Sequence, residues 1–292
     1  MSEQQEHKTW RMLKKAVHGI ALSGLPIGTL VKDVNSTFLG APVIWKVADM
    51  NHAGYPANSI TLITERIVAI IPFDVKEPKN SLSSPRSYGN PVYAWSNIRQ
   101  WLNSDAEAGQ WYTAQHSADQ APTSQIIEYN SYAEDAGFLN GFSEQFKNAL
   151  LTTPLITRKY AAAETLMDKI FLPSTTEVLG TSRHGVVEGS LLQLFKTTNN
   201  RIAYVTAEAI ADSDYKPSNL NTSKAWYWWT RTSHDAVANS QSGSEITAGG
   251  IYAGQTVHSY SRGARPLCNL PSTVRVSETP DEKGVYTIVQ FK

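Results

Sequence analysis

Trp226-Tyr-Trp-Trp-Thr-Arg-Thr, residues 226–232, is the stretch that decides the fold, because three tryptophans and one tyrosine occupy four consecutive positions. A β-strand here would place Trp226 and Trp228 on one face and Tyr227 and Trp229 on the other. Aromatic side chains bury about 150–250 Å² each, and several of them exposed together would favour aggregation. The stretch therefore predicts a strand in the interior of the domain, covered on both faces.

The residues that follow this strand change abruptly in character. Residues 232–261 are rich in Ser, Gly, Ala, Asn and Gln, and they lead into Arg262-Gly-Ala-Arg-Pro-Leu-Cys-Asn-Leu. This pattern predicts a loop of small residues between two core strands. Arg231 and Arg265 would lie on those strands, where a buried guanidinium needs acceptors for up to five donors. Backbone carbonyls of irregular loops supply them most easily, so both arginines are interpreted as structural rather than ligand-binding.

Upstream of this region, short strands and short helices alternate with long loops. Strand-like pieces cover 29–34, 42–49 and 59–64, and residues 74–94 are rich in Pro, Gly and Ser, which favours a surface loop. Helical spacing of apolar residues predicts two helices, at 96–103 and 137–151. A hairpin of residues 273–277 and 285–291 ends the chain. The sequence thus predicts an α+β domain over residues 25–292, with short antiparallel strands, two helices and long loops.

Residues 1–24 form a separate segment in this interpretation. Trp10, Leu13, Val17 and Ala21 share one face of a predicted amphipathic helix, which Gly24 and the proline after Leu25 would end. Such a helix is suited to docking on a partner, and packing against its own domain explains the pattern equally well.

Two sequence blocks resemble a known family. Trp228-Trp-Thr-Arg-Thr and Gly263-Ala-Arg-Pro-Leu-Cys-Asn-Leu fit the patterns W-W-x-R-[ST] and G-x-R-P-x-x-N-L. Together they resemble an uncharacterised bacterial and phage domain family with a C-type-lectin-like fold, distantly similar to formylglycine-generating enzymes and to phage tropism determinants. The residues that carry this signature are Trp228, Trp229, Arg231, Gly263, Arg265 and Pro266.

The resemblance implies a role as well as a fold. Members look like phage structural proteins or surface adhesins, so it implies a virion structural protein, a tail, receptor-binding or capsid-decoration component with a lectin-like recognition domain. The alternatives are a bacterial cell-surface adhesin or carbohydrate-binding module, and a purely structural protein that stabilises the particle. The implied location is the virion or, alternatively, the bacterial surface. The implied partners are other virion proteins through residues 1–24, a host surface glycan or protein, and further copies of the same chain.

The loop of residues 232–261 is the candidate recognition surface. Aromatic and polar side chains among Ser and Gly make an adaptable surface with aromatic anchors, as in antibody paratopes. An ordinary solvent-exposed loop explains the same composition. The candidate ligand-binding residues are His234, Asn239, Gln241, Tyr252, His258 and Tyr260.

Several classes of function are disfavoured by composition. Lys plus Arg and Asp plus Glu each number 26, so the net charge is zero and no nucleic-acid partner is expected. No run reaches the roughly 18–20 apolar residues of a membrane-spanning helix.

No catalytic, metal or cofactor site is predicted. The formylglycine-generating relatives use a cysteine pair or bound copper, whereas this chain has only Cys268, which lies in a predicted core strand. Ser213 and Lys216 have the S-x-x-K spacing of serine acyl-enzymes but lie in a loop without companion motifs. The segment beginning at Glu77, Glu-Pro-Lys-Asn, only approaches a lectin calcium signature. The sequence therefore predicts a protein that is not an enzyme, with no cofactor and no metal.

Overall fold

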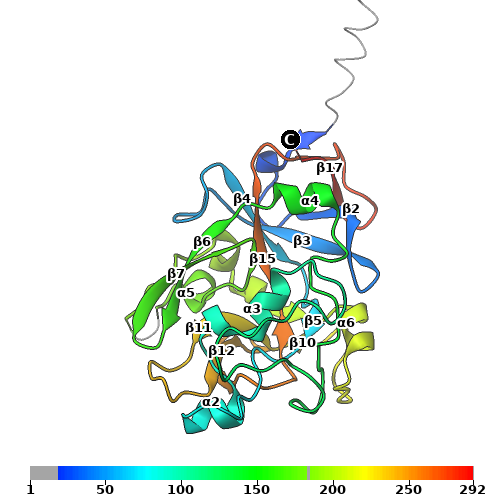
Figure 1. The fold of residues 1–292 in the computed structure, drawn as a ribbon. Helices are drawn as coiled ribbons and strands as arrows, with labels where there is room; N and C mark the ends of the chain where they lie inside the picture. The colour runs from blue at the N-terminus through cyan, green and yellow to red at the C-terminus, as the bar shows by residue number, and fades with distance from the viewer. Residues whose placement is uncertain (1–18, 183–184, 292) are drawn as a thin grey trace, which may run out of the picture.

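Two β-sheets organise the computed structural model, which describes residues 19–182 and 185–291 (Figure 1). The larger sheet has eight strands, and its order places strands from both ends of the chain beside each other. Strands β2, β3, β4 and β15 pair antiparallel, while β17 pairs parallel with β2. In sheet order the strands are β1 (Ile20–Ala21), β16 (Arg275–Val276), β17 (Val285–Gln290), β2 (Leu30–Phe38), β3 (Ala41–Met50), β4 (Ser59–Thr64), β15 (Leu267–Pro271) and β8 (Ile170–Phe171).

The second sheet has five strands and contains Trp228 and Trp229 of the tryptophan-rich stretch. In Figure 1, β2, β3 and β17 occupy the upper half of the molecule, and the second sheet lies in the lower half. Its order is β13 (Tyr252–Thr256), β12 (Ser242–Ile246), β11 (Trp228–Ser233), β14 (Gly263–Ala264) and β5 (Ala69–Ile70). Two smaller pairs join β6 (Thr153–Lys159) to β7 (Ala162–Asp168) and β9 (Ala203–Tyr204) to β10 (Ala225–Trp226).

The interior position expected of the tryptophan stretch is confirmed. Trp228 and Trp229 are fully buried on opposite faces of β11, and Trp226 is 6% exposed. Each indole N–H donates to a backbone carbonyl: Trp226 to Ser261, Trp228 to Arg201 and Trp229 to Ile71. A buried donor without an acceptor would cost about 1–3 kcal/mol, so these bonds remove the main penalty of burying indoles.

The predicted fold class, an α+β C-type-lectin-like domain with two helices and an N-terminal helix, is wrong. Strands make up 31% of the structure and helices 16%, divided among short pieces. The five α-helices of the described residues have five or six residues each, so the sheets rather than the helices form the framework. They are α2 (Ser83–Tyr88), α3 (Asn97–Leu102), α4 (Glu144–Ala149), α5 (Thr175–Leu179) and α6 (Ala207–Asp212); the 3-10 turns are η1 (Leu22–Gly24), η2 (Tyr93–Trp95), η3 (Gln193–Lys196) and η4 (Thr198–Arg201).

The N-terminal helix expected over residues 1–24 falls mostly outside the described residues. Near the start of the described residues, residues 20–21 form β1 and residues 22–24 form η1. Ala21, placed on the apolar face of that helix, therefore belongs to a strand.

The second expected helix, at 137–151, is shorter because other segments take its backbone donors. Phe138 N–H donates to the Trp101 carbonyl, and Leu139 N–H donates to that of Ser104. Ser143 then caps α4, since its Oγ accepts from Phe146 N–H at 3.1 Å. Helical spacing upstream of Ser143 thus reflects packing of a turn rather than a helix. The first helix, by contrast, begins at the predicted Ser96 cap, which accepts from Arg99 N–H.

No helix among residues 19–182 and 185–291 is long and apolar enough to cross a membrane.

Candidate functional site

The segment expected to be a loop, residues 232–261, is largely a β-hairpin. Strands β12 and β13 pair antiparallel from Ser242 with Thr256 to Ile246 with Tyr252. Strand β12 is mostly buried, whereas β13 is half-buried. Small residues allow β12 to pack closely. At Gly243, a Cβ atom would lie 3.1 Å from the Val257 side chain, which is closer than an ordinary van der Waals contact. Residues 242–256 of the segment are therefore paired as a hairpin, and the candidate side chains lie in separate places.

His234 and Tyr252 lie together across the hairpin. Their rings stack with centroids 5.4 Å apart at 13°, and Tyr252 Oη and His234 Nδ1 are hydrogen-bonded. A Cβ at Gly254 would lie 2.5 Å from the His234 ring, so a glycine is required beneath it.

Asn239 and His258 contact the segment around α2 instead. Asn239 Oδ1 accepts from Ser84 N–H at 2.8 Å at the beginning of α2. The His258 ring packs on Tyr88 with centroids 5.3 Å apart. Burial, and then the neighbouring Lys76 cation, lower the pKa of His258. Both side chains thus fasten the hairpin to α2.

Gln241 and Tyr260 occupy two further environments. The backbone carbonyl of Gln241 accepts from Val257 N–H at 2.9 Å. The Tyr260 ring packs against Tyr129, with centroids 4.9 Å apart, and against Tyr215, 5.3 Å apart. The six candidate residues therefore contact four different neighbourhoods, and among them only Tyr260 packs against two other tyrosine rings.

We call Tyr129, Tyr215 and Tyr260 the tyrosine cluster. All three rings are half-buried, and Tyr129 and Tyr215 are 6.1 Å apart. Asn130 holds the three segments together: its Nδ2 donates to the Tyr260 carbonyl at 2.7 Å, and its Oδ1 accepts from Asp214 N–H at 2.7 Å. The cluster joins three segments that are at least 45 positions apart in sequence, which is why the sequence alone could not assemble it.

An acidic cleft lies beside the tyrosine cluster. A hollow of about 160 Å³ is lined by Asn130, Asp135, Asp212 and Asp214. A larger hollow of about 410 Å³ shares Tyr132, Asp135 and Asp212 with it, so the two hollows adjoin. Each of the three clustered tyrosines is adjacent in sequence, or hydrogen-bonded through its carbonyl, to a residue of the smaller hollow.

The carboxylates of the acidic cleft repel one another. Partial desolvation, and then the charges of Asp212, Asp214 and Glu134, raise the pKa of Asp135 to about 6. Burial and the nearby Asp214 also raise the pKa of Asp212. An arrangement of this kind favours hydroxyl and ammonium donors and disfavours anions.

The signature arginines lie in the scaffold. Arg231 is 1% exposed, and both of its terminal nitrogens donate to the Glu177 carboxylate at 2.6 Å. Although burial alone would lower it, the Glu177 charge holds the pKa of Arg231 above its usual value. Arg265 is also 1% exposed and donates to the carbonyls of Thr64 and Asn200. Burial lowers the pKa of Arg265 to about 10.

The other signature residues also pack in the core. Gly263 is required by close packing, since a Cβ there would lie 2.2 Å from Ile67 Cγ2. Pro266 is buried, and its carbonyl accepts from Thr64 N–H at 3.0 Å. Cys268 is buried in β15, and burial raises the pKa of its thiol, which disfavours the reactive thiolate. Together with Arg231 and Arg265, these residues define the framework on which the hairpin is displayed.

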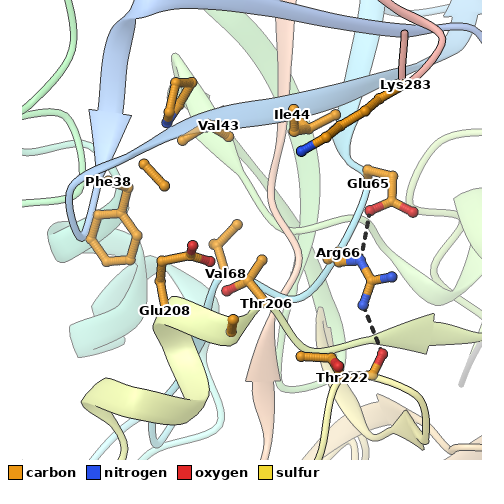
Figure 2. Close-up of a pocket in the computed structure, with 13 residues that line it drawn as sticks. Phe38, Val43, Ile44, Glu65, Arg66, Val68, Thr206, Glu208, Thr222 and Lys283 are labelled. Carbon is orange, nitrogen blue, oxygen red and sulfur yellow. Dashed lines mark hydrogen bonds and ion pairs between the residues drawn. The ribbon is translucent and has the colours of Figure 1, made fainter.

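A third hollow, of about 430 Å³, lies between β3 and α6 (Figure 2). Val43, Ile44 and Val68 form its apolar wall, and Figure 2 shows Glu208 and Arg66 on opposite sides. The Arg66 guanidinium is already engaged, with Glu65 at 3.1 Å and the Thr222 carbonyl at 2.8 Å. This hollow offers one aromatic ring, Phe38, and no ring of the tyrosine cluster lines it.

Three side chains that the sequence did not connect form a Ser–His–Asp contact. His52 Nδ1 lies 2.7 Å from Asp49 Oδ2, and Ser190 Oγ lies 3.3 Å from His52 Nε2. Although burial opposes it, the His52 hydrogen bond lowers the pKa of Asp49. Asp49 also accepts from Gln193 N–H at 3.2 Å, which joins the end of β3 to η3. Ser190, His52 and Asp49 contact one another in the order found in a catalytic triad. None of the three residues lines any of the three hollows described above, so none of these hollows would serve as their substrate cleft.

Comparison with known proteins gives one finding. The model of a family described as "Domain of unknown function (DUF6273)" matches residues 58–272. These residues contain both signature blocks, the tyrosine cluster and the acidic cleft carboxylates. Neither a comparison with curated proteins nor one with solved structures found a match. Because the matched residues make up well over half of the chain, the protein belongs to the DUF6273 family.

Proposed function

We propose that this protein is a non-catalytic recognition domain that binds an oligosaccharide at the tyrosine cluster and acidic cleft. The observation that carries the proposal is the packing of Tyr129, Tyr215 and Tyr260 around Asn130, which also lines the hollow that contains Asp135, Asp212 and Asp214. Ligand sites typically combine aromatic walls with a few convergent polar groups. The arrangement has both.

The chemistry of a sugar fits these two components. Tyrosine presents a large apolar face and a polar tip at little conformational cost, so the C–H face of a sugar ring can pack on it while hydroxyls remain hydrated. Ionised carboxylates only accept hydrogen bonds, and sugar hydroxyls donate them. Tyr129 and Tyr260, tilted by 57° at 4.9 Å, present two faces rather than one flat platform.

The charge of the cleft selects among sugars. Asp135, Asp212 and Asp214 line one hollow, and the neighbouring charges contribute to the raised pKa of Asp135. An additional anion would be repelled there. The preferred ligands are therefore neutral or amino-sugar oligosaccharides rather than sialylated or sulfated ones.

The test begins with the full chain on a glycan array, followed by calorimetry with the strongest ligand. Tyr260→Ala should weaken binding at least about 10-fold, a loss of about 1.4 kcal/mol, without lowering the melting temperature by more than a few degrees. Tyr252→Ala is the matched control, because Tyr252 lies on the same hairpin but packs on His234 outside the cleft. Equal losses in both variants, or no loss in Tyr260→Ala, would place recognition elsewhere or exclude it.

The biological setting we propose is a phage particle or, alternatively, a bacterial surface, as a receptor-binding, tail or decoration component. Its support is the resemblance of the two signature blocks, together with a site suited to surface glycans. Residues 1–24 would contact other particle proteins, and the chain would form homo-oligomers. Deleting residues 1–18, which leaves β1 and the buried Leu22 in place, should abolish incorporation into particles while the remaining chain still folds. Light scattering of the purified protein would measure its oligomeric state.

A purely structural, particle-stabilising role predicts a different outcome. In that case loss of the protein would reduce particle stability, and Tyr260→Ala would affect neither glycan binding nor infection.

A hydrolase is the second candidate function, favoured only by the contact among Ser190, His52 and Asp49. In serine hydrolases this order of side chains lets histidine take the proton of the nucleophile. A fluorophosphonate probe should label Ser190 if the contact is catalytic, and Ser190→Ala should abolish the labelling. Absence of labelling in the folded wild-type chain would leave the contact a structural one.

A further inference from the structure

A compact group of ligand-type side chains lies away from the acidic cleft. Glu77, in the segment before α2, meets His116 and Asp119, in the segment between α3 and α4. Each offers one oxygen or nitrogen atom, and these three atoms all lie within 4.8 Å of one another. Three atoms at this mutual spacing can face a single ion.

The atoms that face each other have no hydrogen-bond partner among the described residues. Glu77 Oε1 and His116 Nε2 are both buried and lie 3.0 Å apart as an ion pair, and neither atom makes a regular hydrogen bond. The Glu77 side chain is 1% exposed, so bulk solvent hardly reaches its carboxylate. A buried polar atom without a partner costs about 1–3 kcal/mol, and a bound ion would remove that cost.

The remaining oxygen atoms of the same residues are fixed by the protein. Asn80 Nδ2 donates to Glu77 Oε2, and Gln115 N–H donates to Asp119 Oδ2 at 2.7 Å. The Trp95 ring packs on His116 with centroids 5.2 Å apart. These contacts hold the side chains in place and leave one carboxylate oxygen of Glu77 free of hydrogen bonds. Metal ligands are commonly oriented by neighbours in this way.

The electrostatics of the group favour a cation. Asp74 is 1% exposed and lies close enough to interact with both Glu77 and Asp119. Burial, and then the Glu77 charge, raise the pKa of Asp74, and burial raises the pKa of Glu77 and of Asp119. Among the described neighbours of these three buried carboxyls, only His116 can carry a balancing positive charge. Ionising all three carboxyls is therefore costly, and a bound cation would lower that cost.

We propose that Glu77, His116 and Asp119 bind a divalent transition-metal ion, Zn²⁺ or Mn²⁺. An imidazole with two carboxylates suits these ions, whereas Ca²⁺ and Mg²⁺ take oxygen ligands. The His116 side chain is 24% exposed, which leaves an approach for the ion and room for a water molecule as a further ligand. This site differs from the sequence expectation of no metal, and it is independent of the proposed glycan site.

The ion would stabilise the segment that carries α2. Glu77 N–H donates to the Pro85 carbonyl, and the Arg86 guanidinium donates to the Asn80 carbonyl. The beginning of α2 is also bonded to Asn239, which precedes β12. A bound ion would add a further attachment at Glu77, so metal binding should reduce amide hydrogen exchange in residues 77–88.

Calorimetry on the full, tag-free chain after chelator treatment and dialysis tests the proposal. ZnCl₂, MnCl₂, CaCl₂ and MgCl₂ are titrated separately. Zn²⁺ or Mn²⁺ should bind with a stoichiometry of one ion per chain, more tightly than Ca²⁺ or Mg²⁺. His116→Gln and Asp119→Asn should each weaken this binding at least about 100-fold, since even substitutions of residues behind metal ligands cost about 10–100-fold. His258→Gln, at a histidine that packs on Tyr88 outside the group, should leave the affinity unchanged.

A second measurement needs no variant. The visible absorption spectrum of the wild-type chain with Co²⁺ reports ligation by nitrogen and oxygen atoms. The proposal is overturned if the wild-type chain binds neither Zn²⁺ nor Mn²⁺. Binding that is the same in His116→Gln and Asp119→Asn, or Ca²⁺ affinity equal to that for Zn²⁺, would overturn it as well, because the imidazole would then not be a ligand.

Discussion

Arg231→Met should destabilise the protein strongly, because it removes the positive charge from a buried ion pair. Arg231 is 1% exposed, and Glu177 is fully buried. The guanidinium donates twice to the Glu177 carboxylate at 2.6 Å and once to the Leu172 carbonyl at 2.9 Å. Removing one partner of such a pair costs about 3–5 kcal/mol, since the other charge stays buried without compensation. Methionine keeps most of the volume, so little of this loss comes from a cavity.

The measurement is thermal unfolding by calorimetry. With an unfolding entropy of about 2.1 cal/mol/K per residue, a chain of 292 residues loses about 1.6 °C of Tm per kcal/mol, which gives a decrease of about 5–8 °C. Arg158→Met is the matched control: Arg158 is fully buried, but its three guanidinium nitrogens have no hydrogen-bond partner among the described residues. That variant should be neutral or stabilised. A decrease below about 2 °C for Arg231→Met, or equal decreases for both variants, would refute the reasoning.

Three further predictions concern the scaffold and the cleft. Gly263→Ala should cost about 1–3 kcal/mol in denaturant unfolding, because its Cβ would lie 2.2 Å from Ile67, whereas Gly249→Ala, whose nearest atom is 3.7 Å away, should be close to neutral. The folded-state pKa of Asp135 is raised to about 6, so the stability of the wild-type protein should fall as the pH rises from about 4 to about 6. The expected decrease is about 1 kcal/mol or less, because solvent screens this carboxylate. Unfolding curves at several pH values should show this decrease in the wild-type protein and not in Asp135→Asn. Asn130→Ala should lower the free energy of unfolding by about 2 kcal/mol and should also weaken glycan binding. The variant removes the hydrogen bonds to the Tyr260 carbonyl and to Asp214 N–H, and it places an alanine at φ 55°.

Local patterns in the sequence predicted local structure well. Most of the tryptophan stretch is buried, as its density of aromatic residues required, although it is divided at Tyr227 between β10 and the buried β11. The cap at Ser96 begins α3, and the meander of three strands after Pro26 forms β2, β3 and β4. These features depend on neighbours in sequence, and the information for them is present in short windows.

The errors arose where distant segments compete for the same groups. Residues 137–142 have helical spacing, but the N–H groups of Phe138 and Leu139 bond to the carbonyls of Trp101 and Ser104 instead. The fold class was wrong for the same reason: β17 pairs with β2 and β15 pairs with β4, across more than 200 residues. Composition alone could not show that residues 242–256 form a hairpin.

The candidate sites show the same limit. Tyr260 was proposed from the composition of its segment, but Tyr129 and Tyr215, which pack on it, lie in other loops. Glu77 and His116 are 39 positions apart and share no motif spacing with Asp119 that a zinc or calcium signature would have revealed. Both groups are products of tertiary folding, so only the structure could reveal them.

The central claim is that a glycan contacts the tyrosine cluster, and fluorine NMR of the chain labelled with 3-fluorotyrosine tests it most directly. Resonances are assigned with single Tyr→Phe variants, and the strongest ligand from the glycan array is titrated into the labelled protein. The account predicts shifts for Tyr129, Tyr215 and Tyr260 that saturate with the calorimetric affinity, while Tyr252 and Tyr93 stay unchanged. Shifts confined to Tyr252, or none in the tyrosine cluster at saturation, would contradict it.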